Sequence, residues 1–155
     1  MRNKIFFRQN LFLKTIVQLR NNKKMKSNLE IVQTVYNSFL QGDIQGILDL
    51  LTDDITWELP SSAGVPFSGV FSGKKGVLDF FQQIAANNDF HEFNVTDFIA
   101  DGDKVVALGN LKATSKTTGK TSSNKWAHFW QLKDGKVIRH YEYADTAEIK
   151  KAFTN

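Results

Sequence analysis

The stretch WAHFWQLKDGKVIRHYEYADTAE, residues 126–148, contains the pattern that decides the fold. Side chains repeat with a period of two over residues 126–132 and again over residues 136–144, which indicates two β-strands. The segment KDGK between them is typical of a tight turn. The pattern therefore predicts a hairpin that carries His128, His140 and Glu142 among several aromatic side chains.

The turn decides which of these side chains share a face, because a slip of one residue exchanges the two faces of a strand. A two-residue Asp-Gly turn of type I′ would pair Ala127 with Glu142. A three-residue loop with Gly135 as a left-handed bulge residue would instead place His128 opposite His140. These are the two alternatives that the sequence leaves open.

We predict the three-residue loop, which pairs Leu132 with Lys136. This arrangement leaves Gln131 and Arg139 together on the outer face, where their polar ends can reach water. The opposite face would then form one wall of a pocket, and it would carry Trp126, His128, Trp130, Ile138, His140, Glu142 and Ala144.

The elements around this hairpin complete an α+β pattern. Ser27 and Glu30 form a capping box that begins a first helix, and Asp43 caps a short second one. We predict strands at residues 55–60, 90–100, 104–115, 123–132 and 136–144, and further helices at residues 74–88 and from Asp145 onward. Sequential hairpins make the sheet mainly antiparallel, and helices gathered on one side of it define the α+β class.

Composition limits the classes of protein that this chain can represent. With 155 residues, 41% of them hydrophobic, the chain suits one globular domain. It has no cysteine, which excludes disulfides and thiolate metal sites. No run of about eighteen apolar residues occurs, so the sequence predicts no transmembrane segment.

The N-terminal segment, residues 1–26, differs from the rest in charge. It holds eight Lys or Arg residues and no acid, so the remainder has 12 basic against 16 acidic residues, a net charge of −4. The body is therefore not expected to bind nucleic acid, which requires a clustered basic surface. The basic extension is either a targeting or membrane-surface segment, or the result of a translation start assigned too early. We assign the folded domain to residues 27–155 and expect a cytoplasmic protein, unless a genuine extension directs it to an organelle.

Three segments together resemble the SnoaL-like branch of the nuclear transport factor 2-like superfamily, which includes polyketide cyclases and ketosteroid isomerases. They are LQGDIQGILDLLTDDITWELP (40–60), VPFSGVFSGKKGVLDFF (65–81) and DGKVIRHYEYADTAEI (134–149). The resemblance covers residues 27–153. It implies a cone-shaped, curved sheet with helices packed on its concave face, enclosing a mostly apolar cavity. It also implies a homodimer through the outer sheet face, for which Phe129, Tyr141 and Tyr143 are the candidates.

Two well-known activities of the superfamily are not expected. The catalytic base of ketosteroid isomerases belongs just before the proline that ends the first strand, where this chain has Leu59. The epoxide hydrolases of the superfamily need an Asp–Arg–Asp set, but the corresponding strand offers Gly109, Asn110 and Leu111.

The resemblance implies a cavity-facing acid where Glu142 lies and a histidine on the preceding strand where His128 lies. Such a carboxyl could act as a general acid or base, with His128 assisting it. His140 is a third candidate. Two histidines and a glutamate could ligate a metal in principle, but we expect neither a metal nor a cofactor. The residues expected to contact a small apolar ligand are Tyr36, Trp57, Leu59, Phe81, Trp126 and Trp130.

Two functional hypotheses follow. The first is an acid/base isomerase or cyclase, or a related lyase or hydrolase, that works without a cofactor on an apolar, carbonyl-bearing molecule. The second is a non-catalytic ligand-binding or dimerisation domain on the same fold.

Overall fold

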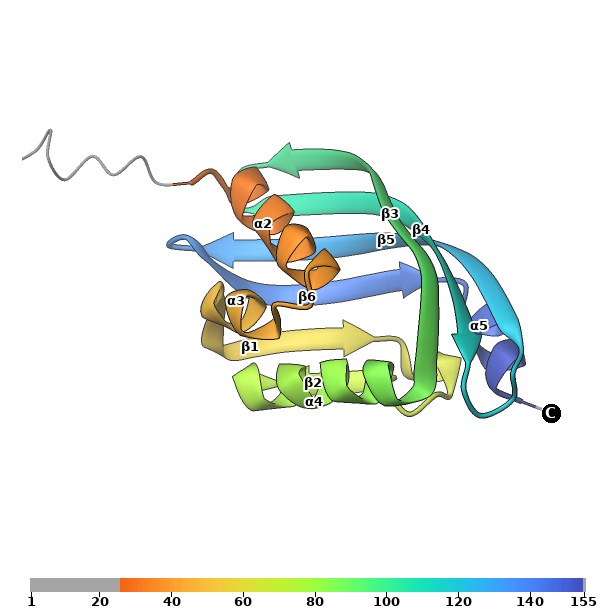
Figure 1. Cartoon of the computed structure of the whole chain (residues 1–155). Coiled ribbons are helices and arrows are strands. Elements are labelled where there is room, and N and C mark those ends of the chain that lie inside the picture. Colours follow the sequence, from red (N-terminus) through yellow and green to blue (C-terminus); the bar gives the residue numbers. More distant parts are fainter. Residues whose placement is uncertain (1–25, 155) are drawn as a thin grey trace, which may run out of the picture.

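Six strands of the described chain form one curved sheet in the order β2-β1-β6-β5-β4-β3, with helices across one of its faces (Figure 1). The computed structural model describes residues 26–154. Along the chain the elements are α2 (Asn28–Leu40), α3 (Ile44–Asp49), β1 (Leu51–Leu59), the 3₁₀ turn η1 (Ser61–Ala63), β2 (Gly69–Ser72), α4 (Gly73–Asn87), β3 (Asn88–Asp101), β4 (Lys104–Ser115), β5 (Thr121–Lys133), β6 (Lys136–Ala144) and α5 (Thr146–Phe153). The predicted α+β class is confirmed.

The helices form where the sequence signals place them. Ser27 caps α2 by accepting a hydrogen bond from the Glu30 backbone N–H, and the Glu30 carboxylate accepts one from the Ser27 backbone N–H. This capping box confirms the predicted start of the first helix. The helices then bury their apolar stripes against the sheet, through Ile31, Val32, Val35 and Tyr36 of α2 and Val77, Phe80 and Phe81 of α4.

One strand was not predicted. β2 pairs antiparallel with β1, with Phe71 opposite Trp57. Its four residues lie in a Ser/Gly-rich segment and are too few to give a clear period of two, so the sequence favoured a loop there. β1 also pairs parallel with β6, which makes the sheet mixed, although its other pairings are antiparallel within residues 26–154.

The predicted loop between β5 and β6 is wrong. Lys133 pairs with Lys136, and the two residues between them, Asp134 and Gly135, have φ values of 51° and 75°. Positive φ at both central positions is the signature of the two-residue type I′ turn, which matches the twist of the flanking strands. The alternative that the sequence analysis set aside is therefore the one that forms.

A bulge beyond the turn nevertheless keeps the predicted faces. Leu132 pairs with Val137 and Gln131 pairs with Arg139, so one extra residue, Ile138, lies between these pairs on β6. The bulge shifts the register by one residue, and Glu142 lies opposite His128 rather than Ala127. Val137 is fully buried in the core, and Ile138 does not form the inner wall that the sequence analysis assigned to it.

The boundary of the predicted N-terminal extension falls at the edge of the described part. Residues 1–25 lie outside it, so the division of the chain at residue 26 stays a prediction. Among residues 26–154 no helix is both long enough and apolar enough to cross a membrane.

Candidate functional site

A cavity lies between the inner face of the sheet and the helices. Its volume is about 90 Å³. The cavity is partly open to solvent, so a ligand larger than this volume can extend out of it. Of the expected ligand contacts, Tyr36, Trp57, Leu59, Phe81 and Trp130 line the cavity, and so do the three candidate catalytic residues His128, His140 and Glu142.

Trp126 is not among the lining residues, although the sequence analysis expected it there. Its indole stacks on the His128 ring, with centroids 4.0 Å apart and an interplanar angle of 23°. It also stacks against Phe93, with centroids 5.1 Å apart. Gly109 on β4 pairs with Trp126, and a Cβ at Gly109 would overlap the indole. Trp126 therefore supports His128 rather than the ligand.

A chain of polar contacts connects the sheet with α2. The Trp130 indole N–H donates to the Tyr36 hydroxyl oxygen at 3.0 Å, and the Tyr36 hydroxyl lies 2.9 Å from Nδ1 of His128. On the far side of the same imidazole, Nε2 lies 3.6 Å from a carboxylate oxygen of Glu142. The side chains of His128 and Glu142 are 10% and 13% exposed.

These contacts assign the proton positions. An indole nitrogen can only donate, so the Tyr36 oxygen accepts from Trp130 and its own proton is free to point to Nδ1 of His128. A neutral imidazole that accepts at Nδ1 carries its proton on Nε2, the atom that faces Glu142. The resulting order of donors is Trp130 to Tyr36 to His128, and the Nε2 atom of His128 faces the Glu142 carboxylate at 3.6 Å, just beyond hydrogen-bond distance.

Tyr36 remains a hydroxyl donor in this chain. Burial raises the pKa of Tyr36 above its ordinary value of 10.0; the hydrogen bond from Trp130 opposes this increase and the Glu142 carboxylate adds to it. Tyr36 therefore positions His128 and is not itself a base. The sequence predicts Tyr36 only as a ligand contact, because the placement of a helix against a distant strand leaves no sequence signal.

His140 lies in an apolar part of the same wall. Its ring stacks on Trp57, with centroids 3.9 Å apart, and contacts Trp130 and His128. Burial lowers the pKa of His140 well below its ordinary value of 6.5, and the neighbouring His128 adds to this effect. His140 is therefore neutral. Neither of its ring nitrogens has a hydrogen-bond partner within the described chain, and the same holds for the indole N–H of Trp57.

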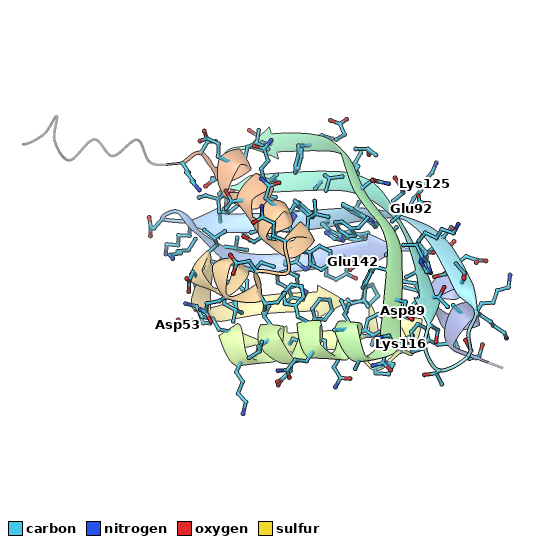
Figure 2. All side chains as sticks on the ribbon, in the orientation of Figure 1. Asp53, Asp89, Glu92, Lys116, Lys125 and Glu142 are labelled. Carbon is cyan, nitrogen blue, oxygen red and sulfur yellow. The ribbon has the colours of Figure 1, made fainter. Side chains whose placement is uncertain are left out.

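The described lining of the cavity carries few charged side chains. Glu142 is the one acidic residue of the described lining, which includes no Lys or Arg. Figure 2 shows Glu142 in the middle of the molecule, whereas Asp53 lies at its edge, and the other labelled charged residues are exposed. Apart from Glu142, the described lining is dominated by apolar and aromatic side chains. An anionic group on a ligand would therefore find no cation to pair with.

A metal site is not apparent at these residues. The described part of the chain contains no group of three or more His, Cys, Asp or Glu side chains arranged to hold a metal ion. Its imidazole and carboxylate groups instead contact one another and the surrounding aromatic rings.

The comparisons with known proteins agree with this architecture. The profile of the SnoaL-like domain family matches residues 32–140. An NTF2-like protein of unknown function from Burkholderia pseudomallei superposes with a TM-score of 0.77 at 25% identity, covering 84% of this chain and all of that one. The crystal structure of TerC, co-crystallised with polyporic acid, superposes with a TM-score of 0.73 at 27% identity, covering 81% of this chain and 96% of that one.

A curated relative is similar in sequence as well. The patulin biosynthesis cluster protein F of Penicillium expansum is 23% identical over 128 residues, which are 77% of this chain and 64% of the relative. The chain therefore spans less than two thirds of the length of that relative. The cone-shaped fold, the cavity and the matched profile agree with the resemblance found in the sequence, and the chain belongs to the SnoaL-like domain family.

Proposed function

We propose that the protein is an acid/base enzyme that isomerises or cyclises a small, largely apolar, carbonyl-bearing molecule without a cofactor. One observation carries the proposal: a mostly buried carboxylate, Glu142, faces an imidazole whose other nitrogen is hydrogen-bonded to Tyr36, and Tyr36 is itself held by Trp130. A mostly buried base beside an oriented imidazole in an apolar cavity is an arrangement suited to proton transfer at carbon.

The reaction would begin with removal of a proton from the carbon next to the carbonyl group. The Glu142 carboxylate takes the proton, and the electron pair of the C–H bond forms an enolate. Return of the proton to a different carbon gives an isomer, whereas attack of the enolate carbon on a second carbonyl of the same molecule closes a ring. In the second case the new alkoxide takes up the proton. His128 faces the carboxylate with Nε2 at 3.6 Å, and it would assist the transfer by donating to Glu142 once substrate binding brings the two side chains closer.

The enolate oxygen needs a hydrogen-bond donor, and the lining provides candidates. The indole N–H of Trp57 and the N–H of the neutral His140 ring are both buried, and neither has a partner among residues 26–154. Donors that are already in place and free of other partners stabilise a developing oxyanion without reorganisation. We assign Trp57 and His140 to this role.

The lining also limits the substrate. It has no described cation, so a carboxylate or phosphate ligand is disfavoured, and the aromatic walls favour a planar, apolar body. The names of the similar proteins support small organic substrates, since one belongs to a patulin biosynthesis cluster and another was crystallised with polyporic acid.

The proposal is tested with 2-tetralone, a two-ring ketone with acidic protons next to its carbonyl. In D₂O the wild-type protein is expected to accelerate the exchange of these protons for deuterium, which proton NMR follows directly.

The second candidate function is a non-catalytic ligand-binding protein. The observation in its favour is the 3.6 Å separation between His128 and Glu142, which exceeds a hydrogen bond. Binding of 2-tetralone without faster exchange would support this second function instead.

The predicted homodimer also belongs to the proposal. On the outer face, Ile99, Val106, Phe129 and Tyr141 form one apolar row across four adjacent strands. Ile99 and Tyr143 on this face are each 59% exposed, and a contiguous exposed apolar patch marks an interaction site. Light scattering at micromolar concentration is expected to give twice the monomer mass, and Phe129→Glu to give the monomer. A wild-type monomer under these conditions would rule the interface out.

A cytoplasmic location likewise remains a prediction.

A further inference from the structure

The cavity has a second polar end, which the sequence analysis did not identify. Asn124 lies on the inner face of β5 and lines the cavity together with Ser122. Asn124 is only 5% exposed, and within residues 26–154 its Oδ1 atom has no hydrogen-bond partner. A buried carbonyl oxygen without a donor loses the hydrogen bonds that water would give it in the unfolded chain. The Oδ1 atom of Asn124 is therefore an unsatisfied hydrogen-bond acceptor.

The position of Asn124 relative to the candidate catalytic residues is fixed by the strand. Asn124 and His128 are four residues apart on β5 and point to the same face, which places their Cα atoms roughly 13 Å apart. The neighbours of Asn124 across the inner face, Leu111 on β4 and Phe93 on β3, are apolar and also line the cavity. A ligand that reaches from Glu142 to Asn124 thus meets polar groups at both ends and apolar walls between them.

We propose that Asn124 forms a second ligand subsite, which binds a hydroxyl group at the end of the ligand remote from Glu142. A hydroxyl donates its proton to the Oδ1 atom and can accept from the Nδ2 amide of the same side chain. The absence of Lys and Arg from the described lining favours a neutral hydroxyl over a carboxylate. The orientation of the ligand rests on the proposed function, whereas the subsite itself does not. The substrate class becomes neutral hydroxylated ring ketones.

A purely structural role for Asn124 is the competing explanation. Trp126 lies two residues farther along the same face, and its indole N–H has no hydrogen-bond partner in the described structure either. If the two side chains bonded to each other, Asn124 would stabilise the fold and contribute nothing to binding. The two explanations differ in whether Asn124 senses a hydroxyl on a ligand.

The test uses two probes that differ by one hydroxyl at the end remote from the ketone: 2-tetralone and 6-hydroxy-2-tetralone. Titration calorimetry on the full chain measures both affinities for the wild type, for Asn124→Leu and for the control Asn110→Ala on the outer face of β4. One new hydrogen bond to a buried acceptor is expected to make the hydroxylated probe bind about tenfold more tightly to the wild type. Asn124→Leu should reduce this ratio to about twofold or less, and Asn110→Ala should leave it unchanged.

A second measurement on the wild type avoids any loss of folding in the variant. The side-chain amide signals of Asn124 in a ¹H–¹⁵N spectrum are expected to shift with the hydroxylated probe and not with 2-tetralone. Equal affinities in the wild type, a tenfold ratio that survives in Asn124→Leu, or failure of both probes to bind would each overturn the subsite. Proton exchange is measured separately. A tenfold affinity ratio between the two probes without catalysed exchange would refute the proposed enzyme activity and support the subsite. Catalysed exchange with equal affinities for the two probes would support the enzyme activity and refute the subsite.

Discussion

His128 lies directly opposite Glu142 on neighbouring strands, with Nε2 3.6 Å from the carboxylate. This pair exists because the bulge at Ile138 moves β6 by one residue relative to β5. Without the bulge, the type I′ turn would have placed Glu142 opposite Ala127 and its side chain on the outer face. A single extra residue in a strand thus determines whether the chain has a carboxylate in its cavity.

Tyr36→Phe is expected to destabilise the protein and to loosen His128. The change removes the acceptor for the Trp130 indole N–H and the donor to Nδ1 of His128. Leaving buried polar groups unpaired in this way lowers the free energy of unfolding by about 1–3 kcal/mol. Urea unfolding measures the loss, with Tyr143→Phe on the exposed outer face as the control.

The same variant also tests the proton assignment. Imidazole ¹⁵N NMR of the wild type is expected to show His128 protonated on Nε2, and Tyr36→Phe to show a mixture of the two neutral forms. A wild-type spectrum with the proton on Nδ1 would contradict the order of donors.

His140 is expected to make stability depend on pH. Its pKa is lowered in the folded state by burial, so below about pH 6.5 the unfolded chain binds a proton that the folded chain does not. His140 therefore does not lower the free energy of unfolding well above pH 6.5. Below pH 6.5 the free energy of unfolding falls by up to about 1.4 kcal/mol for each pH unit.

His140→Leu removes this dependence. The difference in unfolding free energy between the wild type and His140→Leu should therefore change by about 1 kcal/mol between pH 6.5 and pH 5.5, to the disadvantage of the wild type. The exposed His91 on β3 provides the control, through His91→Leu. If the wild type and His140→Leu lose stability in parallel over this range, the buried neutral imidazole is not correct.

Gly109→Ala is expected to disturb the stacked support of His128. A Cβ at this position would overlap both the Trp126 indole and the backbone oxygen of Asn94. Overpacking of this kind costs about 1–3 kcal/mol of stability, and the displaced indole should change the near-ultraviolet circular dichroism. Asn110→Ala, one residue away on the outer face, should stay within about 0.5 kcal/mol of the wild type. Unchanged stability in Gly109→Ala would show that Trp126 has room to move.

The sequence predicted most of the fold for identifiable reasons. The capping box at Ser27 and the period of two along β3 to β6 are local signals, and local structure follows them. β2 was not predicted, because its four residues in a Ser/Gly-rich segment form a strand only by pairing with the edge of β1. The placement of His128 and Glu142 on the inner face was predicted from the wrong turn, since a bulge has no reliable sequence signal.

The candidate site likewise combines residues that the sequence identified with contacts that only the tertiary structure shows. Glu142 and His128 were candidates because they lie on one hairpin and because the resemblance implies an acid and a histidine at these positions, whereas His140 was a candidate from the hairpin alone. The partnership of Tyr36 with His128 joins residues 92 positions apart, and the exposure of Asn124 to the cavity depends on the packing of three strands. Neither relationship is encoded in a local pattern, so both required the structure.

The most direct test of the central claim is the rate at which 2-tetralone exchanges its protons in D₂O with wild type, Glu142→Gln and the control Glu58→Gln on the outer face. Replacing a carboxylate by an amide of equal size removes the base and keeps the shape of the cavity. We expect Glu142→Gln to bind the ketone normally and to exchange its protons about 100-fold or more slowly than the wild type, with Glu58→Gln unchanged. Equal exchange rates in the wild type and Glu142→Gln would show that Glu142 is not the base.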